Sequence, residues 1–273
     1  MTLHVEGLSK RFGGLLAVDG VGFCAAPAQV TSVIGPNGAG KTTLLNMISG
    51  VSTCDAGRLV LFDDELGGGA PLAMARHGLA RTYQTPQLFV GMSVLDTVMV
   101  GAHLAGRCDF LSALFNFRGV RREERRLEAL AREALARVDL PEDLYDRPAD
   151  ELAYGLQRRV EIARALAMKP RALLLDEPAA GLNTQETRAL STLIRELAGT
   201  GLLVVLVEHD MEMVMGISDH VVVMNFGRKI AQGTPQEMQD DPAVIEAYLG
   251  TEALQDVQAD QDQRCEDADA RVA

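Results

Sequence analysis

The hydrophobic pattern divides the chain into an opening part rich in strands, a middle part with helical spacing, and a last part in which the two alternate. Alternating apolar positions predict two antiparallel strands over 3–8 and 18–23, and the β-branched run 30–34 predicts a third strand that ends at a glycine. A helix is expected over 42–49, followed by a strand over 57–62. The opening third is therefore expected to be β-rich.

The strand pattern disappears between residues 84 and 153. Apolar residues predict a helix over 94–104, and over 121–138 they form one helical stripe opposite a face of arginine and glutamate. The stripe consists of Leu127, Leu130, Ala131, Ala134, Leu135 and Val138. Because glutamates alternate with the arginines, the pattern favours a solvated face with i,i+4 pairs over a basic binding patch. We expect a helical subdomain inserted at about 88–165.

Strands and helices alternate in the last part of the chain. The predicted strands are 172–175, 202–207, 221–224 and 229–232, and the predicted helices are 185–197 and 212–217. This alternation predicts an α/β fold with a parallel sheet covered by helices.

Composition narrows the class of protein. The chain has 273 residues, of which 47% are hydrophobic and 23% charged, as in ordinary folded proteins. Its longest apolar runs, such as 202–207, are far shorter than the ~18 residues that span a bilayer. The first residues lack the basic and apolar regions of a secretory signal, so a cytoplasmic location is expected. The four cysteines form no C-x-x-C pair, which argues against a zinc site or a disulfide framework.

The charge is negative and unevenly distributed. A net charge of −12 argues against broad electrostatic attraction to nucleic acid, which usually needs a basic surface. Residues 251–273 carry seven carboxylates against two arginines, and their apolar side chains are few. This segment is expected to be a disordered acidic tail.

One glycine-rich segment matches the G-x-x-x-x-G-K-[ST] phosphate loop and lies between a predicted strand and a predicted helix. It consists of Gly35, Pro36, Asn37, Gly38, Ala39, Gly40, Lys41 and Thr42. The glycines let successive N–H groups turn inward and the helix N-terminus favours an anion, while Lys41 reaches the β- and γ-phosphates and the Thr42 hydroxyl binds Mg²⁺. The motif predicts a nucleoside triphosphate site. The alternative, a plain glycine-rich turn, is weak because the placement also fits.

Two carboxylates, Asp176 and Glu177, follow the apolar run 173–175. In this arrangement one acid anchors the metal and the next can activate water. Alternation along a strand predicts that the two side chains point to opposite sides. Many buried strands end in solvated acids, so the pair alone is a modest signal. Together with the phosphate loop it becomes a strong indication of a nucleotide-hydrolysing site.

With these motifs in this order, residues 1 to about 250 resemble an ATP-binding-cassette (ABC) ATPase. The resemblance implies a P-loop NTPase core with an antiparallel β subdomain and an inserted helical subdomain. It identifies Gln84 as the Q-loop glutamine, which senses Mg²⁺, and His209 as the switch histidine that holds the γ-phosphate and the attacking water. Glu177 would be the catalytic base. The resemblance also implies that the nucleotide contacts Phe12, Val18 and Thr43, although an aromatic after a first strand also suits a core.

The signature segment begins at Leu152 and departs from the usual L-S-G-G-Q pattern, because Ala153 replaces the serine while Gly155 is kept. In the family this segment reaches across a dimer interface to the partner's γ-phosphate, through the hydroxyl, glycine N–H groups and a helix N-terminus. Ala153 leaves only backbone donors. Asn183 stands where the family's D-loop more often has aspartate. We therefore expect pairing with a second, different ATPase, with a homodimer as the alternative.

Several strings resemble one branch of the family, the ATP-binding subunits of branched-chain amino acid importers. They are residues 11–18, 152–155, 177–183, 215–219 and 247–250. The resemblance implies membrane permease partners at the cytoplasmic face of the membrane and, indirectly, an external substrate-binding protein. ATPases for urea, amide and lipopolysaccharide transport share parts of these strings. A second alternative is a soluble ABC ATPase, which usually has two cassettes or a long coiled coil, and neither fits this chain. A third is a degenerate cassette that binds ATP only as a scaffold, and the site residues that this chain retains argue against it.

Overall fold

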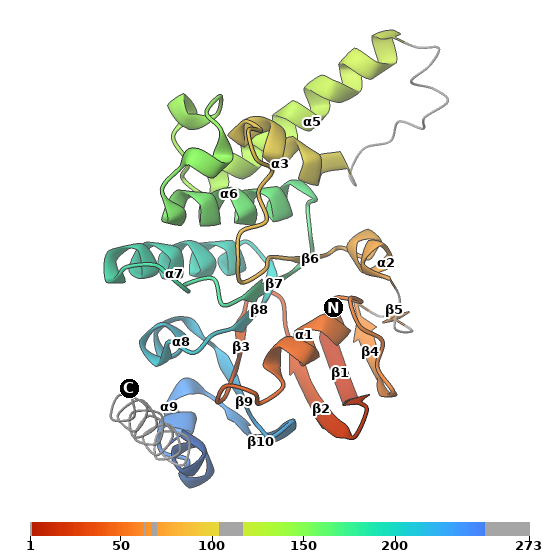
Figure 1. Ribbon diagram of the computed structural model, residues 1–273, viewed down its shortest axis with the longest axis vertical. Helices are drawn as coiled ribbons and strands as arrows, with labels where there is room; N and C mark the ends of the chain where they lie inside the picture. Colours follow the sequence, from red (N-terminus) through yellow and green to blue (C-terminus); the bar gives the residue numbers. More distant parts are fainter. Residues whose placement is uncertain (1, 63, 67–69, 104–116, 249–273) are drawn as a thin grey trace, which may run out of the picture.

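The computed structural model describes residues 2–62, 64–66, 70–103 and 117–248. Two sheets organise this part of the chain (Figure 1). The first has four antiparallel strands in the order β2-β1-β4-β5. Its strands are β1 (Leu3–Phe12), β2 (Leu15–Ala25), β4 (Ala56–Leu61) and β5 (Asp64–Leu66). The expected antiparallel β subdomain is present, with longer strands than the hydrophobic pattern indicated.

The second sheet has six strands in the order β10-β9-β3-β8-β7-β6. They are β3 (Val30–Ile34), β6 (Leu79–Arg81), β7 (Ala172–Asp176), β8 (Leu203–Val207), β9 (His220–Asn225) and β10 (Arg228–Gly233). All neighbouring pairs are parallel except β9 and β10. The expected parallel sheet therefore ends in an antiparallel edge strand, because a loop of two residues joins β9 to β10 and so reverses the chain.

The strands β7 and β8 each have one apolar face toward α1 and one toward α7. In β7, Ala172 and Leu174 belong to the core that contains α1 (Lys41–Ile48) and the four-stranded sheet. Leu173 and Leu175 belong to the core that contains α7 (Thr184–Gly199). Because successive strand side chains point to opposite faces, the continuous apolar runs of the sequence indicate strands that are buried on both sides.

The remaining helices cover the edges of this framework. They include α2 (Pro71–Arg76), α8 (Met211–Ile217) and α9 (Pro235–Gln239). Val214 of α8 and Met238 of α9 share one core with Ile34 of β3 and Val221 of β9.

Three helices form a separate layer above α7 in Figure 1. They are α3 (Val94–Ala102), α5 (Phe117–Arg137) and α6 (Tyr154–Ala167), which contact one another, with short 3-10 turns at Glu142–Leu144 and Ala149–Glu151. All six residues of the predicted stripe in 121–138 are buried. Residue 104 of the predicted helix and the predicted tail 251–273 lie outside the described residues.

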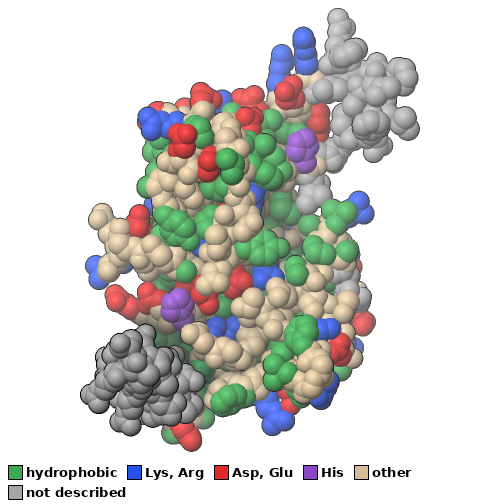
Figure 2. Space-filling model, in the orientation of Figure 1, with side chains coloured by type: hydrophobic (Ala, Val, Ile, Leu, Met, Phe, Trp, Pro, Cys, Tyr) green, Lys and Arg blue, Asp and Glu red, His purple; other side chains and the backbone are tan. Residues whose placement is uncertain are grey.

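The charged face of α5 is solvated as expected. Arg132 pairs with Glu128 at 2.9 Å, four residues earlier, and Arg126 pairs with Glu123 at 3.2 Å. Figure 2 shows acidic and basic side chains interspersed on the face it presents, rather than gathered in one basic patch. Among the described residues, no helix combines the length and apolarity that crossing a bilayer requires.

Candidate nucleotide-binding site

The phosphate loop, Glu177 and His209 follow the carboxyl ends of three neighbouring parallel strands. The phosphate loop follows β3, Glu177 follows β7, and His209 lies two residues after β8. Parallel strands end at the same edge of a sheet, which is where α/β folds bind their ligands. The topology therefore brings the phosphate loop together with two residues that lie more than a hundred positions later in the sequence.

The phosphate loop leaves the N-terminus of α1 free to bind an anion. Gly40 is the N-cap residue of α1, with φ +98°, and no side chain caps the helix. A Cβ atom at Gly40 would collide with the carbonyl oxygen of Ala17, so glycine is required there. The first N–H groups of a helix lack partners within the helix, and together with the helix dipole they form a phosphate site.

Lys41 is buried and held by the loop that it would serve. Its Nζ donates to the carbonyl oxygens of Gly35, at 2.7 Å, and Pro36, at 3.0 Å. Burial lowers the pKa of Lys41, while the carboxylates of Glu177 and Asp176 oppose this shift. Phosphate oxygens would replace the neutral carbonyl partners with anionic ones, which form stronger hydrogen bonds to an ammonium group.

A cleft of about 420 Å³ lies over the loop. Its lining comprises Phe12, Leu15–Ala17, residues 37–43, Glu177, Phe226 and Gly227. Phe12 is 52% exposed, so it is free to meet a ligand rather than packed in the core. Three of the predicted nucleotide contacts, Val18, Gly35 and Pro36, do not line the cleft. Val18 is fully buried. Val18 instead packs behind Gly40. Phe226 was not anticipated from the sequence.

Asp176 is buried beside an arginine that sequence reasoning missed. Arg81, at the end of β6, donates to the Asp176 carboxylate at 2.8 Å. The same guanidinium donates to Asn46 at 2.8 Å and to Ser49 at 2.7 Å, both at the end of α1. Arg81 thus joins β6, β7 and α1 behind the phosphate loop.

Glu177 lies where Gln84 and His209 converge. The Gln84 amide nitrogen donates to Glu177 Oε2 at 2.8 Å, and His209 Nδ1 lies 3.7 Å from the same oxygen. Glu177 has left the strand and has a φ of +45°. A turn in the backbone, rather than strand alternation alone, therefore separates Glu177 from Asp176. Two residues predicted from distant motifs, Gln84 and His209, thus meet at the carboxylate of a third, Glu177.

Glu208 fixes the loop that carries His209. This carboxylate is fully buried and accepts the backbone N–H of Ala179 at 2.7 Å and that of His209 at 3.0 Å. Burial raises the pKa of Glu208, and the two N–H groups oppose the shift. Glu208 thereby connects the end of β8 to the segment that follows Glu177. In the sequence, only the position of Glu208 directly before His209 pointed to a role for this carboxylate at the site.

A buried ion pair on α6 holds the backbone of the Q-loop. Arg158 and Glu161 are 2.7 Å apart and essentially inaccessible to solvent. Arg158 donates to the carbonyl oxygens of Tyr83, at 2.6 Å, and Gln84. Glu161 accepts the N–H of Tyr83 at 3.1 Å, and burial raises the pKa of Glu161 against the opposing effect of Arg158. Helix α6 is therefore connected directly to Gln84, the residue that contacts Glu177.

Ala153, Gly155 and Asn183 lie on a different part of the chain from the phosphate loop. Ala153 is the N-cap residue of α6 and forms no side-chain cap. A Cβ atom at Gly155 would lie 2.8 Å from the Glu186 carboxylate. Asn183 caps α7 by accepting the N–H groups of Gln185 and Glu186, each at 3.0 Å. None of the three lines the cleft of this chain.

The C-terminal end of the described chain packs against the phosphate loop. Residues 242–248 are helical, and Val244 and Tyr248 pack on the core formed by α8, α9 and β9. Burial raises the pKa of Tyr248 to about 12, and its hydroxyl lies beside the backbone of Gly35. In the sequence, Tyr248 stood out only as part of residues 247–250, one of the strings that resemble branched-chain amino acid importers.

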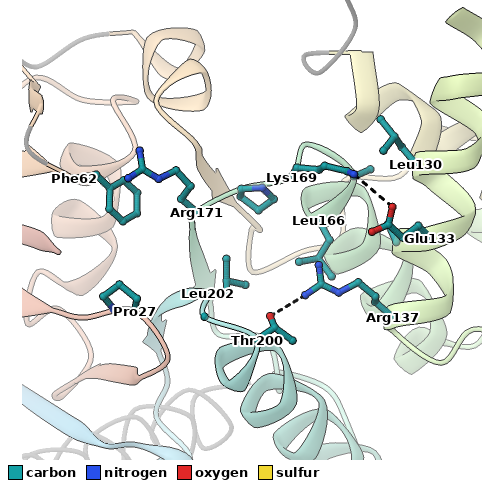
Figure 3. A pocket seen from close by; sticks show the side chains of 14 residues that line it. Pro27, Phe62, Leu130, Glu133, Arg137, Leu166, Lys169, Arg171, Thr200 and Leu202 are labelled. Carbon is teal, nitrogen blue, oxygen red and sulfur yellow. Dashed lines mark hydrogen bonds and ion pairs between the residues drawn. The ribbon is translucent and has the colours of Figure 1, made fainter. Parts of the chain in front are cut away.

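A second cavity, of about 380 Å³, lies between α5 and the amino ends of β7 and β8 (Figure 3). Its basic side chains already have partners. Arg171 lies over the ring of Phe62, Lys169 pairs with Glu133, and Arg137 donates to Thr200. Because it lies at the opposite end of the strands, this cavity connects the helical layer to the sheet and is separate from the phosphate loop.

The predicted metal ligands have the right chemistry for Mg²⁺. The Thr42 hydroxyl, the Gln84 amide oxygen and the Asp176 carboxylate are hard oxygen donors, and Mg²⁺ typically uses one or two such ligands together with substrate phosphates. Among the described residues, no cluster of three or more acidic, histidine or cysteine side chains could hold a metal. The three oxygen donors themselves are of the kind that Mg²⁺ prefers.

Comparison with known proteins identifies the class. A family model described as ABC transporter matches residues 18–180, so the chain belongs to this family of ATP-binding cassettes. A crystal structure of a nucleotide-free ATP-binding cassette from an ABC transporter is 34% identical, with a TM-score of 0.79, and the match covers 91% of this chain and 99% of that one. An ADP-bound cassette has the same identity and TM-score. The resemblance stated from the motifs and the expected fold are confirmed.

The particular relatives are subunits of amino acid transporters. The BraF protein of Pseudomonas aeruginosa, a high-affinity branched-chain amino acid transport ATP-binding protein, is 47% identical over 91% of this chain and 97% of its own length. The LivG protein of Escherichia coli, with the same description, is 45% identical over equal shares. A second family model, described as Branched-chain amino acid ATP-binding cassette transporter, matches residues 228–253.

Proposed function

We propose that this chain is the ATP-hydrolysing subunit of an ABC importer for branched-chain or other hydrophobic amino acids. The observation that carries the activity is the convergence of Gln84 and His209 on Glu177, at the edge that holds the phosphate loop. The substrate class rests on the two relatives and on the model that matches the C-terminal region. Urea, amide or lipopolysaccharide transport and a soluble ABC ATPase are the alternatives.

The site is arranged for in-line attack of water on the γ-phosphate. Lys41 and the N–H groups of α1 would bind the phosphates, and Glu177 would accept the proton of the attacking water. Gln84 and His209 would orient that water, because both contact the Glu177 carboxylate. Mg²⁺, held by Thr42, Asp176 and Gln84, would neutralise phosphate charge.

The same proposal covers the organisation of the transporter. Residues 1–250 would form the ATPase domain, with the helical subdomain at about 88–165 and the acidic tail at 251–273. Two ATPase subunits would enclose two ATP molecules and bind membrane permeases at the cytoplasmic face. The second subunit would be a different chain, with a homodimer as the alternative. An external substrate-binding protein would deliver the substrate to the permeases. We expect no nucleic acid among the binding partners of the chain.

Substituting Glu177 tests the catalytic assignment. We expect Glu177→Gln to reduce steady-state phosphate release severely while ATP binding persists, because only the base is lost. Glu196→Gln, an exposed substitution on α7 with the same loss of charge, is the matched control. Lys41→Ala should instead weaken ATP binding in calorimetry. Phosphate release by Glu177→Gln at the wild-type rate would contradict the assignment.

The substrate class needs an experiment on whole cells. We expect mild-detergent purification of the tagged chain from membranes to recover permease subunits and a second ATPase. Uptake of labelled leucine should fall when Lys41→Ala replaces the wild-type chain. A loss of urea uptake with normal leucine uptake would favour the urea alternative.

A further inference from the structure

The β9–β10 hairpin carries a phenylalanine where its backbone favours asparagine. Asn225 and Arg228 pair across a loop of two residues, Phe226 and Gly227. Their φ angles are +45° and +78°. Positive φ at both positions is the type I′ arrangement, for which Asn-Gly is the preferred sequence. A bulky side chain at positive φ is a strained exception, so turn geometry does not explain Phe226.

Packing does not explain this residue either. The Phe226 side chain is 83% exposed. It belongs to none of the three hydrophobic cores of the described residues. The ring therefore adds little to stability, while its backbone conformation is unfavourable. A residue that the fold does not need, at a strained position, suggests a role in binding.

The hairpin holds Phe226 next to the phosphate loop. The N–H of Gly227 donates to the carbonyl oxygen of Ala39 at 3.0 Å. The carbonyl oxygen of Gly227 accepts the N–H of Asp19 at 2.8 Å, and Arg228 pairs with the Asp19 carboxylate at 2.7 Å. β10 also contacts β2, as Figure 1 shows. The turn is thus anchored to both segments that border the nucleotide cleft.

The lining of the cleft combines two kinds of chemistry. The phosphate-loop backbone, Lys41 and Thr42 suit phosphates. The rings of Phe12 and Phe226, together with Leu15 and Leu16, add an apolar and aromatic part. A ligand that matches both parts has a phosphate chain joined to a flat aromatic group. A purine nucleoside triphosphate has this form.

We propose that Phe226 is a second base-contacting residue, which packs on the purine of the bound nucleotide together with Phe12. The inference rests on the proposed nucleotide site and adds to it a residue from the β9–β10 hairpin. Base–aromatic stacking is favourable because every base presents a π face, and covering that face excludes water. Phe226 thus contributes to the affinity for the base and not to the affinity for the phosphates.

Phe226→Asn separates the two contributions. The substitution removes the ring and introduces the residue that a type I′ turn prefers, so we expect the melting temperature to rise. The Kd for ATP should increase about tenfold, which equals about 1.4 kcal/mol of lost stacking. The Kd for inorganic tripolyphosphate, which has no base, should stay the same. If Phe226→Asn stabilises the fold and still weakens ATP binding, the weaker binding cannot be the result of a destabilised fold.

Two variants serve as controls. Phe226→Tyr keeps an aromatic ring and should bind ATP like the wild type. Ile230→Thr changes an apolar β-branched side chain of the same hairpin that does not line the cleft, and it should leave the Kd for ATP unchanged.

Calorimetry with ATP and tripolyphosphate decides between the outcomes. Equal ATP affinity in Phe226→Asn and the wild type would overturn the inference and leave the proposed function intact. An equal loss for ATP and tripolyphosphate would also overturn it, because Phe226 would then act through the phosphate loop. If tripolyphosphate and ATP bind Lys41→Ala as tightly as the wild type, the proposed site itself fails, and the inference fails with it.

Discussion

Ala153→Ser should stabilise the fold even in the isolated chain. Ala153 is the N-cap residue of α6, and its carbonyl oxygen already accepts the N–H groups of Leu156 and Gln157. Its side chain caps nothing, whereas a serine hydroxyl would accept the N–H of Gly155 or Leu156. A serine cap in place of alanine is worth about 1 kcal/mol. For a domain of this size, the melting temperature should rise by about 2 to 4 °C.

The same substitution should also raise ATP turnover if α6 faces a partner's γ-phosphate. A hydroxyl has one donor in addition to its acceptor sites, so the introduced serine could cap the helix and still donate to the phosphate. A donor to a charged oxygen is worth roughly 1.5 to 3 kcal/mol. An increase in turnover of about tenfold corresponds to the lower end of this range. A homodimer would gain this donor in both sites and a heterodimer in one.

A second alanine cap separates the two effects. Ala70 is the N-cap residue of α2, with φ −62° and ψ 154°, and it also lacks a side-chain cap. Ala70→Ser should therefore raise the melting temperature as Ala153→Ser does, but leave turnover unchanged. Scanning calorimetry and a phosphate-release assay measure the two quantities.

Two results would refute this reasoning. A melting temperature of Ala153→Ser equal to that of the wild type would contradict the missing cap. Unchanged turnover, together with a stable ATP-bound homodimer of Glu177→Gln, would show that Gly155 and the N-terminus of α6 complete the site without a hydroxyl.

Three further predictions follow from other parts of the chain. Arg158→Met should destabilise the fold by about 3 to 5 kcal/mol, because it leaves Glu161 buried without its partner. In urea unfolding, the double variant Arg158→Met/Glu161→Gln should recover part of this loss. A cost of Arg158→Met below about 1 kcal/mol would contradict the buried pair. Burial raises the pKa of Glu208, so its charge destabilises the fold as the pH rises through that pKa. The melting temperature of Glu208→Gln should therefore improve relative to the wild type as the pH rises above 4.5, the ordinary pKa of a glutamate, and a constant difference would exclude this effect. Deleting 251–273 should leave the melting temperature and ATPase activity nearly unchanged, whereas a drop of several degrees would show that the tail docks.

Periodicity predicted the long elements because their environments are uniform. The strands of the six-stranded sheet that are buried on both faces appear in the sequence as continuous apolar runs, and the buried stripe of α5 repeats at helical spacing. Most of the elements that were missed are short: β5 and β6 have three residues each, α2 has six and α9 has five. The exception is α6, which has 14 residues and received no predicted range of its own, although it falls almost entirely within the expected helical subdomain. The short segments contain too few positions to establish a period. Their partners, which are distant in sequence, determine their structure.

The site was predictable where a motif fixes both residue type and spacing, as in the phosphate loop. The supporting residues were not. Arg158 and Glu161 are three residues apart on a helix, a spacing that normally indicates a solvated surface pair. They are buried because Tyr83 and Gln84, more than seventy residues earlier, present backbone groups that need partners. No local pattern reveals that need.

These supporting residues explain how the helical layer and the catalytic edge behave as one unit. The ion pair of α6 holds the backbone of Gln84, and the side chain of Gln84 contacts Glu177. A displacement of α6 must therefore either move Gln84 or break hydrogen bonds that are shielded from water. Breaking them would leave a buried guanidinium and a buried carboxylate without their partners, which is far more costly than shifting an exposed loop. Movement of the helical layer is thus expected to change the contact between Gln84 and Glu177.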